Sequence, residues 1–594
     1  MWAPSKAVNG EKKSEEKSLA PYEFDKNEPG NLARRCIDQP RRMKVICIGA
    51  GMSGIITGIF FPRQIANLDL VIYDKNPELG GTWYESRYPG VACDVPSHAY
   101  QFTFESNPHW SRYWAGGAEI LDYLRHVATK YGADKYMKFN IRVTKAEWNE
   151  EGGKWHVALE RTDTGETFTD TSDVLLSATG ALNKWKMPDI PGLDSFKGPV
   201  MHSATWDPNF DVTGKRIALI GGGASGIQIL PQIAPKAKYV DHYMKGKTWI
   251  PPFGIGALGV LNRSGDPVTP QDELDAWKDP ANYLNYRKEI ERSLHGASDV
   301  LYKGTDNALA FQKMCEDHMR SKLAKKPEIF EALKPDFAPA CRRLTPGPGY
   351  LEALVRDDVN FISTTIKEVT PTAIVTKDGK VREVDAIVCA TGFAGYQQHF
   401  PLIGKNGINL QQQWEDDIPE SYVGLAPENM PNYYCFLGPN GGPGVGSAVP
   451  FLEFGARYMI KCVQKLQREW LKSMTPKRSA IKKFGEYTDK YLEPTVFNSS
   501  CRAWWRHHLN GRILALWPGS ALHGMYLWSN PRWEDYEYEL KDEQHGNPFS
   551  WLGNGYCVSQ VEGKDTTAYL DDENLKVPVV NPLEAKYLEG QVSF

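Results

Sequence analysis

Two stretches of the chain carry the same order of apolar and polar positions. The first, MKVICIGAGMSGIITGIFF from Met43, predicts a buried strand, a glycine-rich turn and an apolar helix, and LDLVIYDKN supplies the next strand. The second, KRIALIGGGASGIQILPQIA from Lys215, repeats this order and is followed by the strand YVDHYM. Repeated units of this kind predict an α/β fold with two doubly wound, Rossmann-like dinucleotide-binding domains.

The pattern around these units predicts the domain organisation. Residues 269–334 carry apolar side chains at helical spacing, which predicts a helical insertion in the second domain. The expected parts are a flexible extension at 1–42, the first part of the first dinucleotide-binding domain at 43–195, a linker at 196–207, the second dinucleotide-binding domain at 208–380, and the rest of the first domain with the C-terminal region at 381–594.

Composition argues against several other classes of protein. The 594 residues are 41% hydrophobic and 24% charged, which is typical of a soluble globular protein, and the net charge of -4 argues against a nucleic-acid partner. No apolar run is long enough to span a membrane, and the polar N-terminus lacks the apolar core of a secretory signal. The ten cysteines form no CxxC pair, so we expect no metal site and a reduced, cytoplasmic location.

The first glycine motif predicts a dinucleotide site. Gly49 permits the tight turn, Gly51 lets the backbone approach a pyrophosphate, and Gly54 lets the helix pack closely on the strand. Asp74 ends the next strand, where an acid binds the ribose hydroxyls. Because strand, helix and acid accompany the glycines, the motif is specific.

The second motif differs at the ribose position. It consists of Gly221, Gly222, Gly223, Ala224, Ser225 and Gly226. Asp241 lies too early in the following strand, and Lys245 and Lys247 stand where an acid would bind NAD. A cation there suits the 2′-phosphate of NADPH, although two lysines on a surface are also common. Two dinucleotide sites without a redox cysteine pair indicate hydride transfer from NADPH at the second site to FAD at the first, and the reduced flavin then reacts with O2 or another small acceptor.

A third motif lies just before the second glycine turn. Residues Phe196, Gly198, His202, Trp206 and Asp207 match FxGxxxHxxxW[PD], and the chain thereby resembles the type I Baeyer–Villiger monooxygenases. Related monooxygenases that oxidise nitrogen or sulfur usually carry Tyr or Phe at the position of Trp206.

Further phrases extend this resemblance over roughly residues 40–540. They are GGTW at 80–83, YPG at 88–90 and CDVPSHAY at 93–100. Two others, CRRLTPGPGYLEAL and ALWPGS, are most similar to fungal members that tailor natural products.

The resemblance implies two sets of cofactor contacts beyond the glycine turns. For FAD they are Gly81, Thr82, Trp83, Ala92, Cys93, Asp94, Val95 and Tyr100. For NADPH they are Ile227, Gln228, Lys245, Gly246 and Trp504, with Trp505 as an open alternative to Trp504.

The resemblance also implies the catalytic residues. Arg343 lies in a Cys-Arg-Arg-Leu segment where the family has a KRP-like sequence, and Arg342 is the one-residue alternative. Asp94 is expected to position this arginine, which stays protonated and stabilises anionic oxygen. His202 is expected to organise the hinge between the domains rather than to transfer a proton.

The activity implied by the resemblance is insertion of one oxygen atom from O2 beside a ketone carbonyl. A flavin C4a-peroxide would attack a small-molecule ketone and give an ester or lactone, in secondary metabolism. Oxygenation of nitrogen or sulfur by the same flavin chemistry is the alternative within the enzyme class. A flavoprotein that has lost its activity and serves as a binding partner is the alternative outside it.

Overall fold

The computed structural model describes residues 35–252, 268–395, 398–507, 510–541 and 547–571. Most of the expected N-terminal extension therefore lies outside the described residues. The chain divides into a large unit of residues 42–467 and 471–539 and a small unit that holds the remaining residues.

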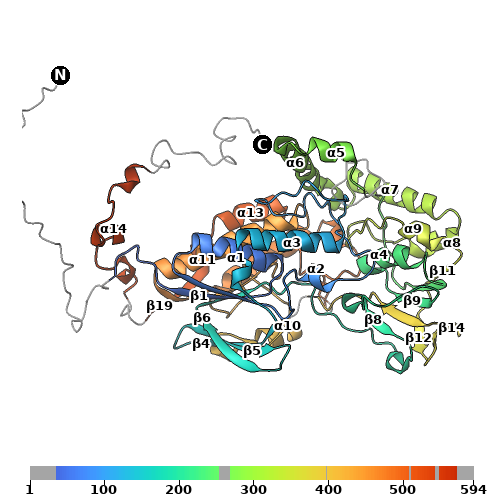
Figure 1. Ribbon diagram of the computed structural model, residues 1–594, viewed down its shortest axis with the longest axis horizontal. Coiled ribbons are helices and arrows are strands. Elements are labelled where there is room, and N and C mark those ends of the chain that lie inside the picture. Colours follow the sequence, from blue (N-terminus) through green and yellow to red (C-terminus); the bar gives the residue numbers. More distant parts are fainter. Residues whose placement is uncertain (1–34, 253–267, 396–397, 508–509, 542–546, 572–594) are drawn as a thin grey trace, which may run out of the picture. The chain divides into compact units, whose positions relative to one another are not determined.

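The first parallel sheet of the large unit has the strand order β17-β7-β1-β2-β3. Its strands are β1 (Met43–Ile48), β2 (Leu68–Tyr73), β3 (Met137–Lys138), β7 (Val174–Ser177) and β17 (Tyr433–Cys435). Figure 1 shows α1 (Met52–Gln64) and α3 (Gly117–Tyr131) on one side of this sheet. The register places Ile48 beside Tyr73, so the turn after β1 lies next to the end of β2.

A four-stranded sheet covers the other side of the first sheet (Figure 1). It has the order β16-β4-β5-β6, with β4 (Ile141–Asn149), β5 (Lys154–Arg161), β6 (Thr167–Ser172) and β16 (Leu402–Ile403). Alternate residues of β4 and β5 face inward, and Trp148 and Trp155 pack with Ile46 and Leu175 of the first sheet in one core cluster.

The second parallel sheet has the strand order β11-β10-β9-β15-β8. Its strands are β8 (Val200–His202), β9 (Arg216–Ile220), β10 (Tyr239–Tyr243), β11 (Val359–Ile362) and β15 (Ala386–Cys389), with α4 (Ala224–Ile233) after β9 and α9 (Tyr350–Leu354) before β11. A small antiparallel sheet of β12 (Ile366–Val369), β13 (Ala373–Thr376) and β14 (Val381–Glu383) follows β11.

Two expected boundaries need correction. The expected linker at 196–207 contains β8, which pairs in parallel with β15 at the edge of the second sheet. The second domain does not end at residue 380, because β15 pairs with β9 in its centre. The chain returns to the first sheet only after Cys389.

The residues expected to form a helical insertion contain four α-helices. They are α5 (Gln271–Ala276), α6 (Pro280–Gly296), α7 (Asp306–Lys322) and α8 (Pro327–Leu333). Tyr283 of α6 anchors this region, because its hydroxyl contacts His98 Nδ1 at 2.9 Å and accepts a bond from Gln101 at 2.8 Å. Part of the second domain, residues 253–267, lies outside the described residues.

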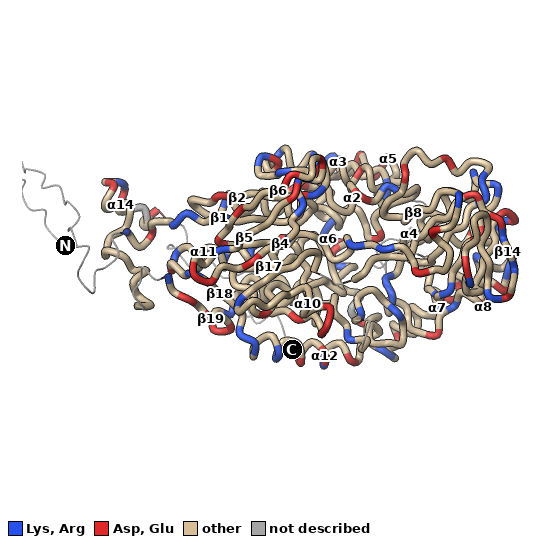
Figure 2. The backbone as a smooth tube through the Cα atoms, turned by 90° about the horizontal axis from the view of Figure 1, so that it is seen from below, with Lys and Arg blue, Asp and Glu red and all other residues tan. Residues whose placement is uncertain are grey.

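The C-terminal third of the large unit is mostly helical. Its elements are α10 (Leu410–Asp416), α11 (Ala448–Arg468), β18 (Leu471–Pro476), α12 (Arg478–Leu492), α13 (Ala521–Ser529) and β19 (Tyr536–Leu540). Basic and acidic residues are interspersed along the elements of this unit (Figure 2). No helix of the described residues is both long and apolar enough to cross a membrane.

The small unit joins residues from both ends of the chain. The backbone NH of Ile37 donates to Tyr556 O at 3.1 Å, and the NH of Val558, which begins α14 (Val558–Val561), donates to Asp38 Oδ1 at 2.7 Å. The Arg35 guanidinium stacks over the Trp470 ring at 3.6 Å.

Candidate functional site

The first glycine turn forms one wall of a cavity of about 460 Å³. Gly49 has φ +110°, and a Cβ there would lie 2.5 Å from Ala178 O. A Cβ on Gly54 would lie 2.1 Å from Gly49 O, so helix α1 can begin this close to β1 only without a side chain. These two glycines are therefore required by the backbone itself.

The cavity collects many of the residues expected to contact FAD. Gly49, Gly51, Asp74, Gly81, Thr82, Trp83 and Tyr100 line it. Gly54 lies behind the turn, and Ala92, Cys93, Asp94 and Val95 are not among the lining residues. Trp83 and Tyr100 pack edge to face, with ring centroids 5.6 Å apart.

Asp74 holds the end of β2 against the glycine turn. Its Oδ2 accepts a bond from Ala50 N at 2.7 Å, and its Oδ1 accepts one from Asn76 N at 2.8 Å. Burial raises the pKa of this carboxyl, and the two backbone bonds offset part of the increase. The carboxylate lies at the cavity wall, where its remaining lone pairs can accept hydroxyl groups.

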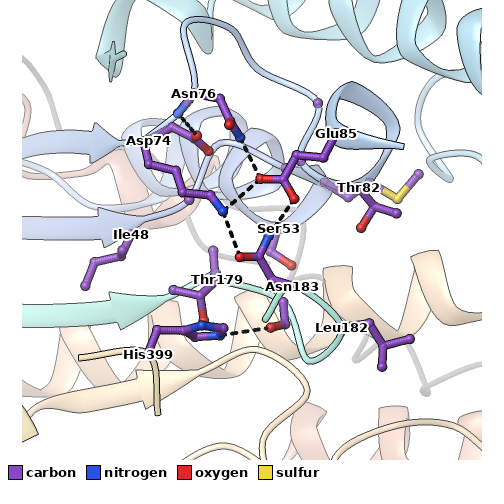
Figure 3. A pocket seen from close by; sticks show the side chains of 18 of the residues that line it. Ile48, Ser53, Asp74, Asn76, Thr82, Glu85, Thr179, Leu182, Asn183 and His399 are labelled. Carbon is purple, nitrogen blue, oxygen red and sulfur yellow. Dashed lines mark hydrogen bonds and ion pairs between the residues drawn. The ribbon is translucent and has the colours of Figure 1, made fainter. Parts of the chain in front are cut away.

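A polar network beside Asp74 was missed from the sequence (Figure 3). Glu85 of the short helix α2 (Thr82–Glu85) accepts bonds from Asn76 at 3.0 Å and Asn183 at 2.8 Å, and it pairs with Lys75 at 2.9 Å. Lys75 also donates to Asn183 Oδ1 at 2.9 Å. All four residues line the cavity, so the network joins the segment after β2, helix α2 and the segment after β7 around it.

A repeated tripeptide could have revealed another part of both turns. Ala-Thr-Gly follows β7 at 178–180 and follows β15 at 390–392. Just as Ala178 O opposes Gly49, Ala390 O lies 2.2 Å from a Cβ built on Gly221, which has φ +116°. The repeat marks the strand that closes each glycine turn.

The second glycine turn has free space beside its backbone at Gly223. A Cβ on Gly226 would lie 2.1 Å from Gly221 O, whereas one on Gly223 would meet nothing within 4 Å. Ala224 and Ser225 begin α4, and Gly222 packs on Met244. Ile227 is buried in the core, so its side chain does not reach a ligand at this surface.

Cations gather after β10, where the ribose position was expected. Lys245, Gly246 and Lys247 are exposed. Arg342 Nη1 donates to Lys247 O at 2.8 Å, so a third cation borders this turn. Asp241 is buried and accepts a bond from Asn360 at 2.8 Å, and therefore does not occupy the ribose position.

The loop at 88–92 connects the two glycine regions. Tyr88 Oη donates to Gln228 Oε1 at 2.8 Å, and Gln228 Nε2 donates to Ala92 O at 3.0 Å. Gln228 and Ala92, both expected to contact cofactors, thus bind each other through these groups.

Arg343 and Asp94 form a bidentate ion pair. Arg343 Nε donates to Asp94 Oδ2 and its Nη2 donates to Oδ1, both at 2.7 Å. The Asp94 carboxylate raises the pKa of Arg343 above its usual value, so the guanidinium stays charged. The Arg343 side chain is 47% exposed and the Asp94 side chain 23%. The adjacent arginines therefore differ: Arg343 reaches the Asp94 loop, and Arg342 reaches the Lys245–Lys247 turn.

His202 lies beside the two connections between the sheets, which pair with each other at Trp185 and Phe393. Its ring stacks on Trp185 at 5.1 Å and packs edge to face on Phe393 at 6.2 Å. Its Nδ1 accepts a bond from Ala204 N at 3.1 Å. Burial lowers the pKa of His202, so the ring is neutral at physiological pH.

The two adjacent tryptophans have different environments. Trp504 is 37% exposed, whereas Trp505 is 3% exposed and packs on Phe497. Only Trp504 of this pair has a ring surface that a ligand can cover.

One pair of cysteines departs from the expectation of reduced thiols. Cys341 and Cys501 form a disulfide with a Cα–Cα distance of 6.1 Å. Cys47 and Cys389 are buried free thiols in the core. In the part of the chain that the structure describes, no His, Cys, Asp or Glu cluster could hold a metal ion.

The geometry defines a class of protein, an oxidoreductase with two dinucleotide turns and a fixed arginine. Comparison with known proteins gives the family. Residues 42–253 match the flavin-binding monooxygenase-like family. The FAD-binding monooxygenase tazF of Aspergillus terreus is 38% identical over 540 residues, which cover 89% of this chain and 94% of that protein. A Baeyer–Villiger monooxygenase of Pseudomonas aeruginosa is 32% identical over 491 residues, 81% of this chain and 88% of that protein.

Solved structures share the fold. The oxidized steroid monooxygenase bound to NADP has a TM-score of 0.71 and 26% identity, covering 84% of this chain and 100% of that chain. The OTEMO complex with FAD and NADP has a TM-score of 0.72 over the same shares at 24% identity. The chain therefore belongs to the flavin-binding monooxygenases, of the Baeyer–Villiger type. The expected family, enzyme class and fold with two Rossmann-type domains are confirmed.

Proposed function

We propose that this chain uses FAD and NADPH to insert one oxygen atom from O2 beside the carbonyl of a ketone, giving an ester or lactone. The observation that carries the proposal is the bidentate pair of Arg343 and Asp94 in a chain with two open dinucleotide turns. The relatives named above support the same chemistry.

The cavity at the first turn suits FAD. Gly51 offers backbone without a side chain at the start of α1, where a pyrophosphate is favoured by the helix N-terminus. Asp74 offers carboxylate lone pairs to ribose hydroxyls, and Trp83 and Tyr100 supply aromatic walls. When bound, the two cofactors supply electrons and activate O2, so that one oxygen atom enters the product and the other leaves as water.

The second turn suits NADPH. Gly223 and the start of α4 leave room for a pyrophosphate, and Lys245 with its neighbours supplies positive charge for a 2′-phosphate. We assign Trp504, rather than Trp505, to the nicotinamide side because only its ring is accessible.

Arg343 acts as the fixed cation of the reaction. Its charge is permanent, and Asp94 accepts hydrogen bonds from its Nε and Nη2 atoms. Nearly half of the Arg343 side chain stays accessible. A guanidinium oriented in advance stabilises negative charge that develops on the reacting oxygen atoms, without reorganisation during the step.

His202 is a positioning residue rather than a proton donor. A neutral ring that is enclosed between Trp185 and Phe393 holds the two interdomain connections together. We also propose a ketone of fungal secondary metabolism as the substrate class, supported by the phrases CRRLTPGPGYLEAL and ALWPGS and by the Aspergillus terreus relative.

Product analysis tests the proposal. The purified protein is incubated with NADPH, a panel of cyclic and linear ketones, and a thioether, and products are identified by mass spectrometry. An ester or lactone from at least one ketone is expected. Oxidation of the thioether without any ester would favour the sulfur-oxygenating alternative, and a flavin that NADPH does not bleach would favour a protein without activity.

A further inference from the structure

The Cys341–Cys501 disulfide joins two segments that the proposed function assigns to NADPH and to catalysis. Cys341 directly precedes Arg342 and Arg343, and Cys501 lies three residues before Trp504. The two cysteines are 160 residues apart in sequence, and both are buried. The bond therefore links the arginine segment, residues 341–344, to the tryptophan segment, residues 499–506.

The arginine segment is held by burial and by single bonds rather than by a helix or a strand, and Cys341 and Leu344 are buried. Residues 343–347 have no regular secondary structure, and Ala340 adopts φ +66°, a left-handed conformation that is unfavourable for alanine. Such a conformation persists only where surrounding bonds hold it. The bonds here are the disulfide, the donation from Cys341 N to Ala338 O at 3.2 Å, the donation from Arg342 to Lys247 O and the Arg343–Asp94 pair.

The tryptophan segment is held in place by contacts on its own side of the bond. Trp505 is buried against Phe497, and Arg506 Nη2 donates to Ser499 O at 2.8 Å. Among the hydrogen bonds and ion pairs of the described residues, none joins residues 341–344 to residues 499–506. The disulfide is thus the covalent link between two segments that both lack a helix or a strand, and no described hydrogen bond or ion pair between them runs beside it.

We propose that the Cys341–Cys501 disulfide is a positioning element for NADPH, an inference that rests on the proposed function. By fixing Cys341, it keeps Arg342 on the Lys245–Lys247 turn and sets the separation of this turn from Trp504. Its loss lets Ala340 relax and moves Arg342 away from the turn. Cofactor binding at the first glycine turn is then unaffected, whereas NADP binding weakens.

The test compares three proteins: the wild type, the double variant Cys341→Ser with Cys501→Ser, and the control Cys557→Ser. Cys557 is a half-exposed free thiol in the small unit, and serine preserves its role as a helix cap. Mass spectrometry of peptides, cut without reductant after free thiols are blocked, first establishes whether the bond is present. Titration with NADP then gives a dissociation constant, and absorbance gives the FAD content.

The double variant should bind NADP about tenfold more weakly, which corresponds to the loss of one hydrogen bond from a charged donor, with unchanged FAD content. Dithiothreitol, which transfers two electrons and two protons to the disulfide, should weaken NADP binding to the wild type in the same way and have no effect on the double variant. Free thiols at both positions in the isolated protein, or a double variant with wild-type affinity for NADP, would overturn the proposal. Lower thermal stability without a change in NADP affinity would also overturn it, because the bond would then only stabilise the fold. Wild-type protein that binds no NADP would instead refute the proposed function.

Discussion

Replacing Arg343 with alanine separates the chemistry of oxygen insertion from the supply of electrons. The change removes both 2.7 Å hydrogen bonds to Asp94 and the cation assigned to the reacting oxygen atoms. Loss of one preorganised donor of this kind typically costs about 3–4 kcal/mol of barrier, a factor of 10² to 10³ in rate. Because the side chain is 47% exposed, the ion pair itself should stabilise the fold by no more than about 1 kcal/mol.

Two measurements on the same protein distinguish these effects. Flavin bleaching by NADPH without oxygen should proceed at the wild-type rate, since Arg343 does not belong to the second glycine turn, while ester formation under air should fall by about 10² or more. Arg216→Ala is the matched control, because Arg216 makes a comparable pair with Asp385 at 2.7 Å outside the site. Ester formation at the wild-type rate by Arg343→Ala would refute the role given to this arginine.

Three further predictions concern the cofactor sites and the core. Lys245→Ala should raise the KM for NADPH about tenfold and leave the KM for NADH unchanged in steady-state assays; equal effects would argue against recognition of the 2′-phosphate. Glu85→Ala should release FAD about tenfold faster, as followed by flavin fluorescence, whereas Glu78→Ala, which breaks an ion pair outside the cavity, should not. Burial lowers the pKa of His242 to about 4, so protons bind the unfolded chain first and the free energy of unfolding should fall by about 1.4 kcal/mol per pH unit from pH 6.5 to 4. Urea unfolding of His242→Gln should show a shallower slope over this range, and an unchanged slope would contradict the assignment.

Local physical chemistry explains which parts were predictable. Gly49 and Gly221 predict tight turns, because a residue with a side chain would not fit at a positive φ this close to a carbonyl oxygen. Each also lies between a predicted strand and a predicted helix. Asp74 followed from its place at the end of the second strand. The roles of Arg343 and of Asp94 beside it followed from the resemblance alone, and the structure adds the two-bond geometry of their ion pair.

Other parts depend on contacts that no local pattern encodes. The chain forms the small sheet of β12, β13 and β14 and then adds β15 to the second sheet. A domain boundary at residue 380 therefore separates this central strand from its sheet. Cys341 and Cys501 meet across 160 residues, and their spacing carries no signal of pairing. Glu85 gains its partners Asn76 and Asn183 only when three elements converge on one cavity.

Incorporation of labelled oxygen tests the central claim most directly. The protein is supplied with NADPH, an accepted ketone and ¹⁸O₂ in unlabelled water, and the product is analysed by mass spectrometry. We predict an ester or lactone whose ring or ester oxygen carries one ¹⁸O atom, formed by the wild type and nearly absent with Arg343→Ala. A product whose new oxygen comes from water, or NADPH oxidation that never yields an ester from any ketone, would contradict a Baeyer–Villiger reaction.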